Sequence, residues 1–314
     1  MKDGNRLLIA YDGSEDAMAA IRTAARLLRK STAVVVHVRG ESFTAGQASL
    51  GRVALPDSVI VTAALNYERA AAGAAQAIAD RGAAVAREAG LQATAVVRTA
   101  LTPWRGVCAA AEVHEVDLIV CGSRGQGGFS RAVLGSTSSS LVHHAPRPVL
   151  VVPPVAVAPD GPVMIGYDGS EGARHAIAVT ARLLDDHPAI VVHAWSSPVQ
   201  HSLVGGSLLA APVAEIQEIA RDLHEVFADQ AQDIAEQGAT LAREHGLDAR
   251  PLAVEATPGP WRALTAAAHT EGAALIVAGS RGRGTVASTM LGSVAASLVH
   301  NAELPVLVVR GTGA

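Results

Sequence analysis

The sequence is poor in the residue types that mark several common classes of protein. Its 314 residues include two cysteines, Cys108 and Cys121, too few for a disulfide framework or a cysteine metal cluster. Aromatic residues make up only 3% of the chain, so Ala, Val and Leu must fill the core, as suits helices packed on a parallel sheet. The net charge of -4 provides no basic surface for nucleic acid. We therefore expect no nucleic-acid partner and two cysteines that act as small apolar side chains.

Long apolar runs and the common catalytic motifs are also lacking. No uninterrupted apolar stretch approaches the roughly 18 residues of a membrane span, and residues 1–6 lead into a short strand rather than a signal-peptide core. The chain has no Walker motif with its lysine and no Gly-x-Ser-x-Gly nucleophile elbow. No histidine pairs with an acidic or cysteine partner at metal-ligand spacing. We expect a cytoplasmic protein without a membrane partner, a metal site or catalytic residues.

An internal repeat organises what is present. The two halves align at an offset of 156 or 157 residues, as in Tyr11 to Tyr167 and Pro103 to Pro260. Such a period is far too long for a solenoid and indicates a duplicated domain. Prolines and a glycine mark a short linker between the copies. The predicted organisation is a first domain at 1–154, a linker at 155–161 and a second domain at 162–314.

Strand and helix patterns alternate in both halves. Helices are expected at 17–30, from about 63 to 89, from 102 onward, and at 136–144 and 293–301. Strands are expected at 7–10, 33–38, 93–97, 117–121 and 149–152, and again at 163–166, 190–193, 250–255, 275–278 and 306–309. This alternation predicts an α/β fold with a doubly wound parallel sheet in each half.

A glycine motif follows the fourth strand of each half. Gly122–Gly125 (GSRG) is followed nine residues later by Gly135 and Ser136, and the spacing returns in the second half. Each motif lies between a buried strand and a helix start, where unpaired backbone N–H groups carry a partial positive charge of roughly +0.5. The pattern is typical of an anion site.

An acidic turn follows the first strand of each half. If strands one and four are neighbours at the switch point of the sheet, Asp12 and Asp168 meet the glycine motifs there. A carboxylate repels phosphate but accepts hydrogen bonds from ribose hydroxyls, so the expected ligand is a nucleoside phosphate. The Asp-Gly-Ser sequence is also a common turn and helix cap, and that interpretation stays open.

The Gly-x-x-Gly, nine residues, Gly-Ser spacing resembles the nucleotide motif of the universal stress protein family. The Asp-Gly-Ser turns, the His37-Val38 end of strand two and the Pro-Val-Leu-Val-Val terminal strands add to the resemblance, which covers both halves. It implies two tandem domains, each with a five-stranded parallel sheet of order 3-2-1-4-5. It also implies binding of ATP, possibly with Mg, or of a related adenine nucleotide.

The resemblance assigns roles to the motif residues. Asp12 and Asp168 would meet the ribose, and the backbone at Val38 and Ala194 would meet the adenine. Arg124 and Arg281 lie inside the motifs and could face phosphate or solvent. The residues expected to meet the phosphates are Gly122, Gly125, Gly135 and Ser136, with Gly279, Gly282, Gly292 and Ser293 in the second half. His37 and His193, at the ends of buried strands, are expected to be packed rather than catalytic.

Three functions fit these observations. The first is a nucleotide-dependent sensor or regulator of the stress response with one ATP site per domain. The second is slow ATP hydrolysis, for which the sequence identifies no base. The third is a nucleotide-free scaffold that binds an unidentified protein through the segments 40–57 or 200–214. Because family members commonly dimerise through their last strands, we also expect residues 149–152 and 306–309 to pair as an internal pseudo-dimer; a homodimer is a further possibility.

Overall fold

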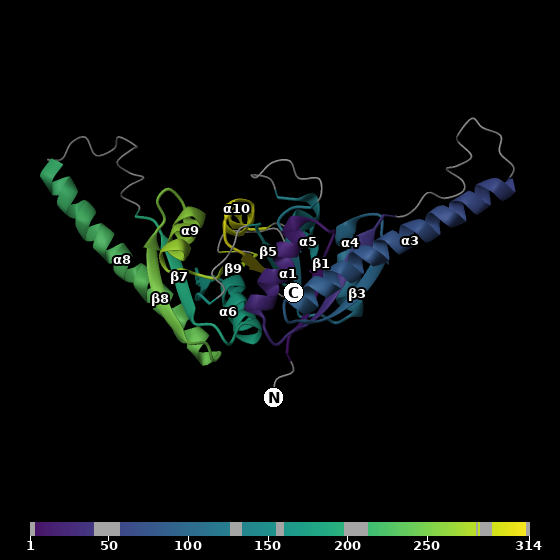
Figure 1. The fold of residues 1–314 in the computed structure, drawn as a ribbon. Helices are drawn as coiled ribbons and strands as arrows, with labels where there is room; N and C mark the ends of the chain where they lie inside the picture. The colour runs from purple at the N-terminus through teal and green to yellow at the C-terminus, as the bar shows by residue number, and fades with distance from the viewer. Residues whose placement is uncertain are drawn as a thin grey trace. The chain divides into compact units, whose positions relative to one another are not determined.

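The computed structural model describes residues 4–40, 57–125, 134–154, 160–197, 213–280, 282 and 291–311. Its contacts divide the chain into two compact units, Met1–Arg147 and Pro148–Ala314. Each unit is an α/β structure built on a mostly parallel sheet, as the sequence predicts (Figure 1). The family resemblance and the alternating pattern therefore lead to the correct fold class.

The first unit has four strands and four helices among its described residues. The strands are β1 (Arg6–Ala10), β2 (Thr32–Arg39), β3 (Gln92–Thr99) and β4 (Leu118–Gly122). The helices are α1 (Glu15–Leu27), α3 (Asp57–Glu88), α4 (Pro103–Val113) and α5 (Ser136–His144). The strands lie in the order β3-β2-β1-β4 and are all parallel. Helices α1 and α3 contact each other on one side of the sheet, while α4 and α5 contact each other on the other.

The second unit repeats this arrangement. Its strands are β5 (Val149–Val152), β6 (Val163–Gly166), β7 (Ala189–Trp195), β8 (Ala249–Glu255), β9 (Leu275–Gly279) and β10 (Val306–Val309). Its helices are α6 (Glu171–Leu183), α8 (Val213–Glu244), α9 (Pro260–Thr270) and α10 (Ser293–Asn301). Strands β8-β7-β6-β9-β10 are parallel and reproduce the predicted order 3-2-1-4-5.

Strand β5 extends the sheet of the second unit. It pairs with β10 in antiparallel register, with Leu150 opposite Leu307. The predicted pairing of the two terminal strands is therefore confirmed, while the internal pseudo-dimer stays a prediction. In the first copy the described pairings give the 3-2-1-4 part of the predicted order, because its fifth strand groups with the second unit.

Alanine stripes hold the two long helices against their sheets. Helix α3 contacts β2 and β3, and α8 contacts β7 and β8 (Figure 1). The fully or almost fully buried alanines are Ala75, Ala79, Ala83 and Ala86 in α3, and Ala231, Ala235, Ala239 and Ala242 in α8. Their spacing of three or four residues places them on one helix face, and their small size brings the helix axis close to the sheet. Small side chains therefore fill the space between helix and sheet, so this core needs few aromatic residues.

Most predicted elements agree with the structure to within two or three residues. Helices α5 and α10 and strands β5, β6 and β10 begin and end at the predicted residues. Helix α3 begins at Asp57 rather than near residue 63. The segments 40–57 and 200–214, which are expected to bind a protein if the chain is a scaffold, lie mostly outside the described residues. Helix α8 begins at Val213 within the second of them. No helix in the described part of the chain is long and apolar enough to cross a membrane.

Candidate functional site

Strand pairing brings the acidic turns and the glycine motifs to the same sheet edge. Strand β1 lies between β2 and β4, with Ile9 opposite Val120. In the second unit β6 lies between β7 and β9, with Ile165 opposite Val277. Because these strands are parallel, the loops that follow β1 and β4, or β6 and β9, begin side by side. The switch-point geometry expected from the sequence is present in both units.

Each acidic turn is held by its own backbone. The Asp12 carboxylate Oδ1 accepts a hydrogen bond of 2.9 Å from the Ser14 N–H, and Gly13 between them has φ of 88°. Ser14 then caps α1 by accepting a 3.2 Å bond from the Ala17 N–H. The second copy has the same 2.9 Å and 3.2 Å bonds, formed by Asp168 with Ser170 and by Ser170 with Ala173. The turn-and-cap interpretation is confirmed in both copies.

The other carboxylate oxygen faces the glycine motif. A Cβ atom placed on Gly125 would lie 2.6 Å from Asp12 Oδ2, and one on Gly282 would lie 2.7 Å from Asp168 Oδ2. Both distances are shorter than a normal contact, so a side chain at either glycine would displace the carboxylate. Glycine fits here because the carboxylate from one loop lies against the backbone of the other, two loops from distant parts of the sequence.

The motif ends at a helix start that is open to an anion. Gly135 precedes α5 and donates its N–H to Ser123 O at 2.8 Å, while Gly292 precedes α10 and donates to Ser280 O at 2.7 Å. Neither helix has a side-chain cap or an acidic residue in its first turn. The first N–H groups of a helix lack partners within the helix and carry partial positive charge. Both helix starts are therefore suited to a phosphate or another anion.

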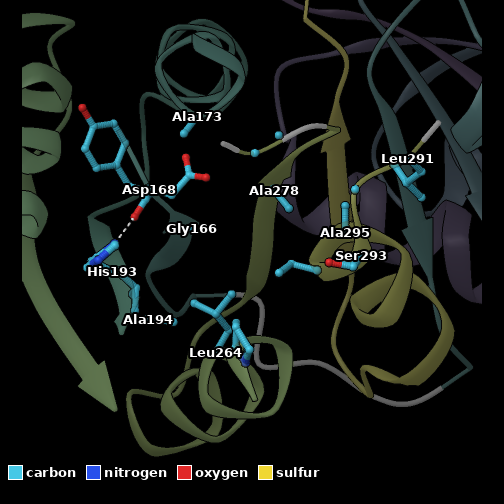
Figure 2. Close-up of a pocket in the computed structure, with 17 residues that line it drawn as sticks. Gly166, Asp168, Ala173, His193, Ala194, Leu264, Ala278, Leu291, Ser293 and Ala295 are labelled. Carbon is cyan, nitrogen blue, oxygen red and sulfur yellow. Dashed lines mark hydrogen bonds between the residues drawn. The ribbon is translucent and has the colours of Figure 1, made fainter. Parts of the chain in front are cut away.

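A cavity of about 570 Å³ joins these features in the second unit. Six predicted site residues line it: Asp168, Ala194, Gly279, Gly282, Gly292 and Ser293. Figure 2 shows Asp168 and Ser293 on opposite sides of it, with Ala194 and Leu264 along its lower side. A volume in this range accommodates a ligand of nucleotide size. The remaining predicted residue of this half, Arg281, lies outside the described residues.

The cavity also has an apolar wall that the sequence analysis missed. Leu264 of α9 and Val192 of β7 line it, together with Leu291 before α10. Sequence patterns identify such residues only as apolar positions of a strand or helix, which is also how core residues look. Pro260 belongs to a repeated segment, yet its repetition alone does not indicate a cavity. The other lining residues not predicted are Gly166, Tyr167, Ala173, His193, Ala278, Val294 and Ala295.

A histidine in β7 lines the cavity, and it and its counterpart in β2 contact the backbone before the acidic turn. His193 Nδ1 lies 2.8 Å from the Tyr167 carbonyl oxygen, and His37 Nδ1 lies 2.9 Å from the Tyr11 carbonyl oxygen in the first unit. A carbonyl oxygen only accepts hydrogen bonds, so Nδ1 is the protonated nitrogen in this contact. Each histidine thus ties the second strand to the residue that precedes the acidic turn, in agreement with the predicted packing role.

The first unit places its predicted residues in matching positions. Gly122 abuts the first turn of α1, since a Cβ on it would lie 2.8 Å from the Asp16 carbonyl carbon. Gly135 lies against the backbone of Arg124, at 3.3 Å from an added Cβ to the Arg124 Cα. Val38 packs beneath α4, where Gly106 leaves room for its side chain. Ser136 is the first residue of α5.

Arg124 has a partner that sequence reasoning did not identify. Its Nε lies 3.1 Å from the Asp16 Oδ2, and the Ser123 hydroxyl donates to the same oxygen at 3.2 Å. The two charged side chains expose only 16% and 14% of their surface. The motif arginine of the first unit is thus held toward the start of α1. Asp16 and Arg124 are 108 residues apart, and no local pattern could have revealed the pair.

The site therefore combines three kinds of chemistry. A carboxylate and a helix start lie at separate parts of the cavity wall, and apolar side chains line the space between α9 and β7. These surfaces suit hydroxyl groups, an anion and a flat apolar group respectively. Among the described residues, no group of three or more His, Cys, Asp or Glu side chains is arranged to hold a metal ion.

Known proteins are similar to this chain in sequence and in fold. The model of the universal stress protein family matches residues 4–153 and again 161–310. A universal stress protein of Mycobacterium tuberculosis is 34% identical over 203 residues, which cover 63% of each chain, so the match spans under two thirds of that relative. Another from the same species is 28% identical over an alignment of 326 positions, gaps included, which covers 99% of both chains. The crystal structure of a universal stress protein from Archaeoglobus fulgidus has a TM-score of 0.59 at 19% identity and covers 99% of both chains. This chain belongs to the universal stress protein family and contains two copies of its domain.

Proposed function

We propose that this chain is a stress-response protein that binds an adenine nucleotide, with one site in each domain, and acts as a nucleotide-dependent regulator. The observation that carries the proposal is the cavity of the second unit, whose wall contains six predicted ligand residues from β7, β9, the start of α10 and the loops after β6 and β9. Family membership supports the stress-response role. ATP is the expected ligand.

The proposed pose follows from the chemistry of the wall. The phosphates would lie at the start of α10, where Ser293, Val294 and Ala295 contribute the first backbone N–H groups of the helix. The ribose hydroxyls would donate to Asp168, and the base would lie against Ala194 and the apolar side chains near it. If Mg accompanies the nucleotide, it would be held through the phosphates rather than by a protein cage.

Isothermal titration calorimetry with ATP and Mg tests the proposal directly. We expect saturable binding, and Gly282→Ala should weaken binding to the second unit about tenfold, because the added Cβ must displace the Asp168 carboxylate. Gly73→Ala provides a matched control, since a Cβ at Gly73 meets nothing within 4 Å. No binding of the unaltered protein at millimolar ATP would refute the proposal.

A further inference from the structure

The two copies of the site differ at one charged position beside the glycine motif. Asp16 is the second residue of α1, whereas Gly172 is the second residue of α6. The neighbouring positions match, because Glu15 corresponds to Glu171 and Ala17 to Ala173. The first site therefore contains a carboxylate at a point where the second site has none.

The carboxylate of Asp16 engages the cation of the first motif. Arg124 Nε and the Ser123 hydroxyl both contact Asp16 Oδ2, at 3.1 Å and 3.2 Å. Because both charged side chains are largely shielded from water, their interaction is screened less than that of a surface ion pair. A phosphate that approached Arg124 would have to compete with Asp16 and would also be repelled by it.

The position of Gly172 makes the difference relevant to the second cavity. Its neighbour Ala173 lines the cavity, as does Gly279, which lies against Gly172. A Cβ on Gly279 would lie 2.8 Å from the Gly172 carbonyl carbon, the same distance that separates the equivalent point on Gly122 from Asp16. The backbone packing is thus equal in the two copies, and an aspartate fits this packing in the first of them.

We propose that Asp16 lowers the affinity of the first site for nucleotide phosphates, so that the two sites are unequal and the second fills first. This inference rests on the proposed nucleotide binding and assigns the inequality to one side chain. Asp16 acts as a specificity-determining residue through Arg124 and through its own charge. Its effect increases with the number of phosphates on the ligand, because the repulsion grows with ligand charge.

Reciprocal exchange of the two residues tests the inference. Calorimetry of the unaltered protein with ATP and Mg should resolve two dissociation constants that differ about tenfold. The loss of one hydrogen bond to a charged group lowers affinity by roughly this factor. Asp16→Gly should raise the affinity of the weaker site toward that of the stronger one. Gly172→Asp should lower the affinity of the stronger site, and the double exchange should restore two unequal sites.

Controls separate charge from structure. Asp16→Asn preserves the shape of the side chain and should act like Asp16→Gly, while adenosine should bind all variants equally because it carries no phosphate. Thermal unfolding of each variant reports any loss of folding. Gly172→Asp does not alter α1, so it tests the inference even if the changes at Asp16 weaken that helix.

The possible failures are distinguishable. Two equal sites in the unaltered protein, or affinities that do not respond to the exchange, would overturn the inference and leave the proposed function intact. Equal effects on adenosine and ATP would overturn it as well, because they would reveal a structural role for Asp16. No ATP binding to any of the variants or to the unaltered protein would overturn the proposed function and this inference together.

Discussion

At the scale of single residues, the two cysteines occupy different environments. Cys121 in β4 is buried, and burial raises the pKa of its thiol from 9.0 to about 12, although a hydrogen bond with Ser138 opposes the shift. Only about one thiol in ten thousand would be ionised at pH 8, and the thiolate is the reactive form. Cys108 in α4 is only partly buried. We therefore expect the native protein to react with a thiol reagent at Cys108 and not at Cys121.

Single-cysteine variants make this prediction measurable. At pH 8, Cys108→Ala should remain unlabelled by iodoacetamide while folded and react fully in urea, whereas Cys121→Ala should react at the rate of the unaltered protein. The raised pKa also has a consequence for stability: the unfolded thiol loses its proton first, so the contribution of Cys121 declines as the pH rises from about 9 to about 12. Labelling of native Cys108→Ala at a comparable rate would contradict the burial of Cys121.

At the scale of elements, helix α3 contains two glycines in opposite surroundings. A Cβ on Gly82 would lie 2.5 Å from the Tyr11 ring and 2.8 Å from a Val35 methyl group, while Gly73 has open space around it. Gly82→Ala should therefore lower the free energy of unfolding by about 1 to 3 kcal/mol through overpacking. Gly73→Ala should raise it by about 0.5 to 1 kcal/mol, because alanine restricts the unfolded chain and favours the helix.

Urea unfolding followed by circular dichroism checks the pair. Because the chain has two units, the transition of the first unit must be separated from that of the second before a free energy is extracted. Gly238→Ala in α8 serves as an internal control, since an added Cβ there would lie 2.7 Å from the Tyr167 ring and should weaken the second unit instead. Equal effects at Gly73 and Gly82 would show that helix propensity, rather than contact with Tyr11, controls these positions.

The sequence predicts the helices and strands better than it predicts the contacts between them. The starts of α5 and α10 follow from a glycine before a stretch that contains neither glycine nor proline, and β5 follows from a proline-bounded apolar run. The Asp16 to Arg124 pair could not be predicted, because only the parallel pairing of β1 with β4 brings these residues together. Leu264 was missed for a different reason: helical periodicity identifies its apolar face but not whether that face meets a core or a cavity.

At the scale of the whole molecule, strand β10 near the end of the sequence pairs with strand β5 from its middle. The residues that β5 and β10 pair, Leu150 with Leu307 among them, are all at most 2% exposed. Such burial is expected for a strand inside a sheet rather than at its edge. The pairing therefore holds the residues before the linker to the residues after it, whether or not the linker itself is intact.

Cleavage of the linker tests the consequence of this pairing. If Val155–Pro159 is replaced by a protease recognition sequence, the cut chain should still elute from a sizing column as one species, because burial of the β5 and β10 side chains persists after the cut. Leu307→Asp should release the two fragments, since it would bury an unpaired charge. Leu101→Asp is the matched control, because Leu101 is 73% exposed and the same substitution there leaves the paired strands unchanged. Separation of the fragments without any substitution would mean that the pairing of β5 with β10 is too weak to connect the two parts of the chain.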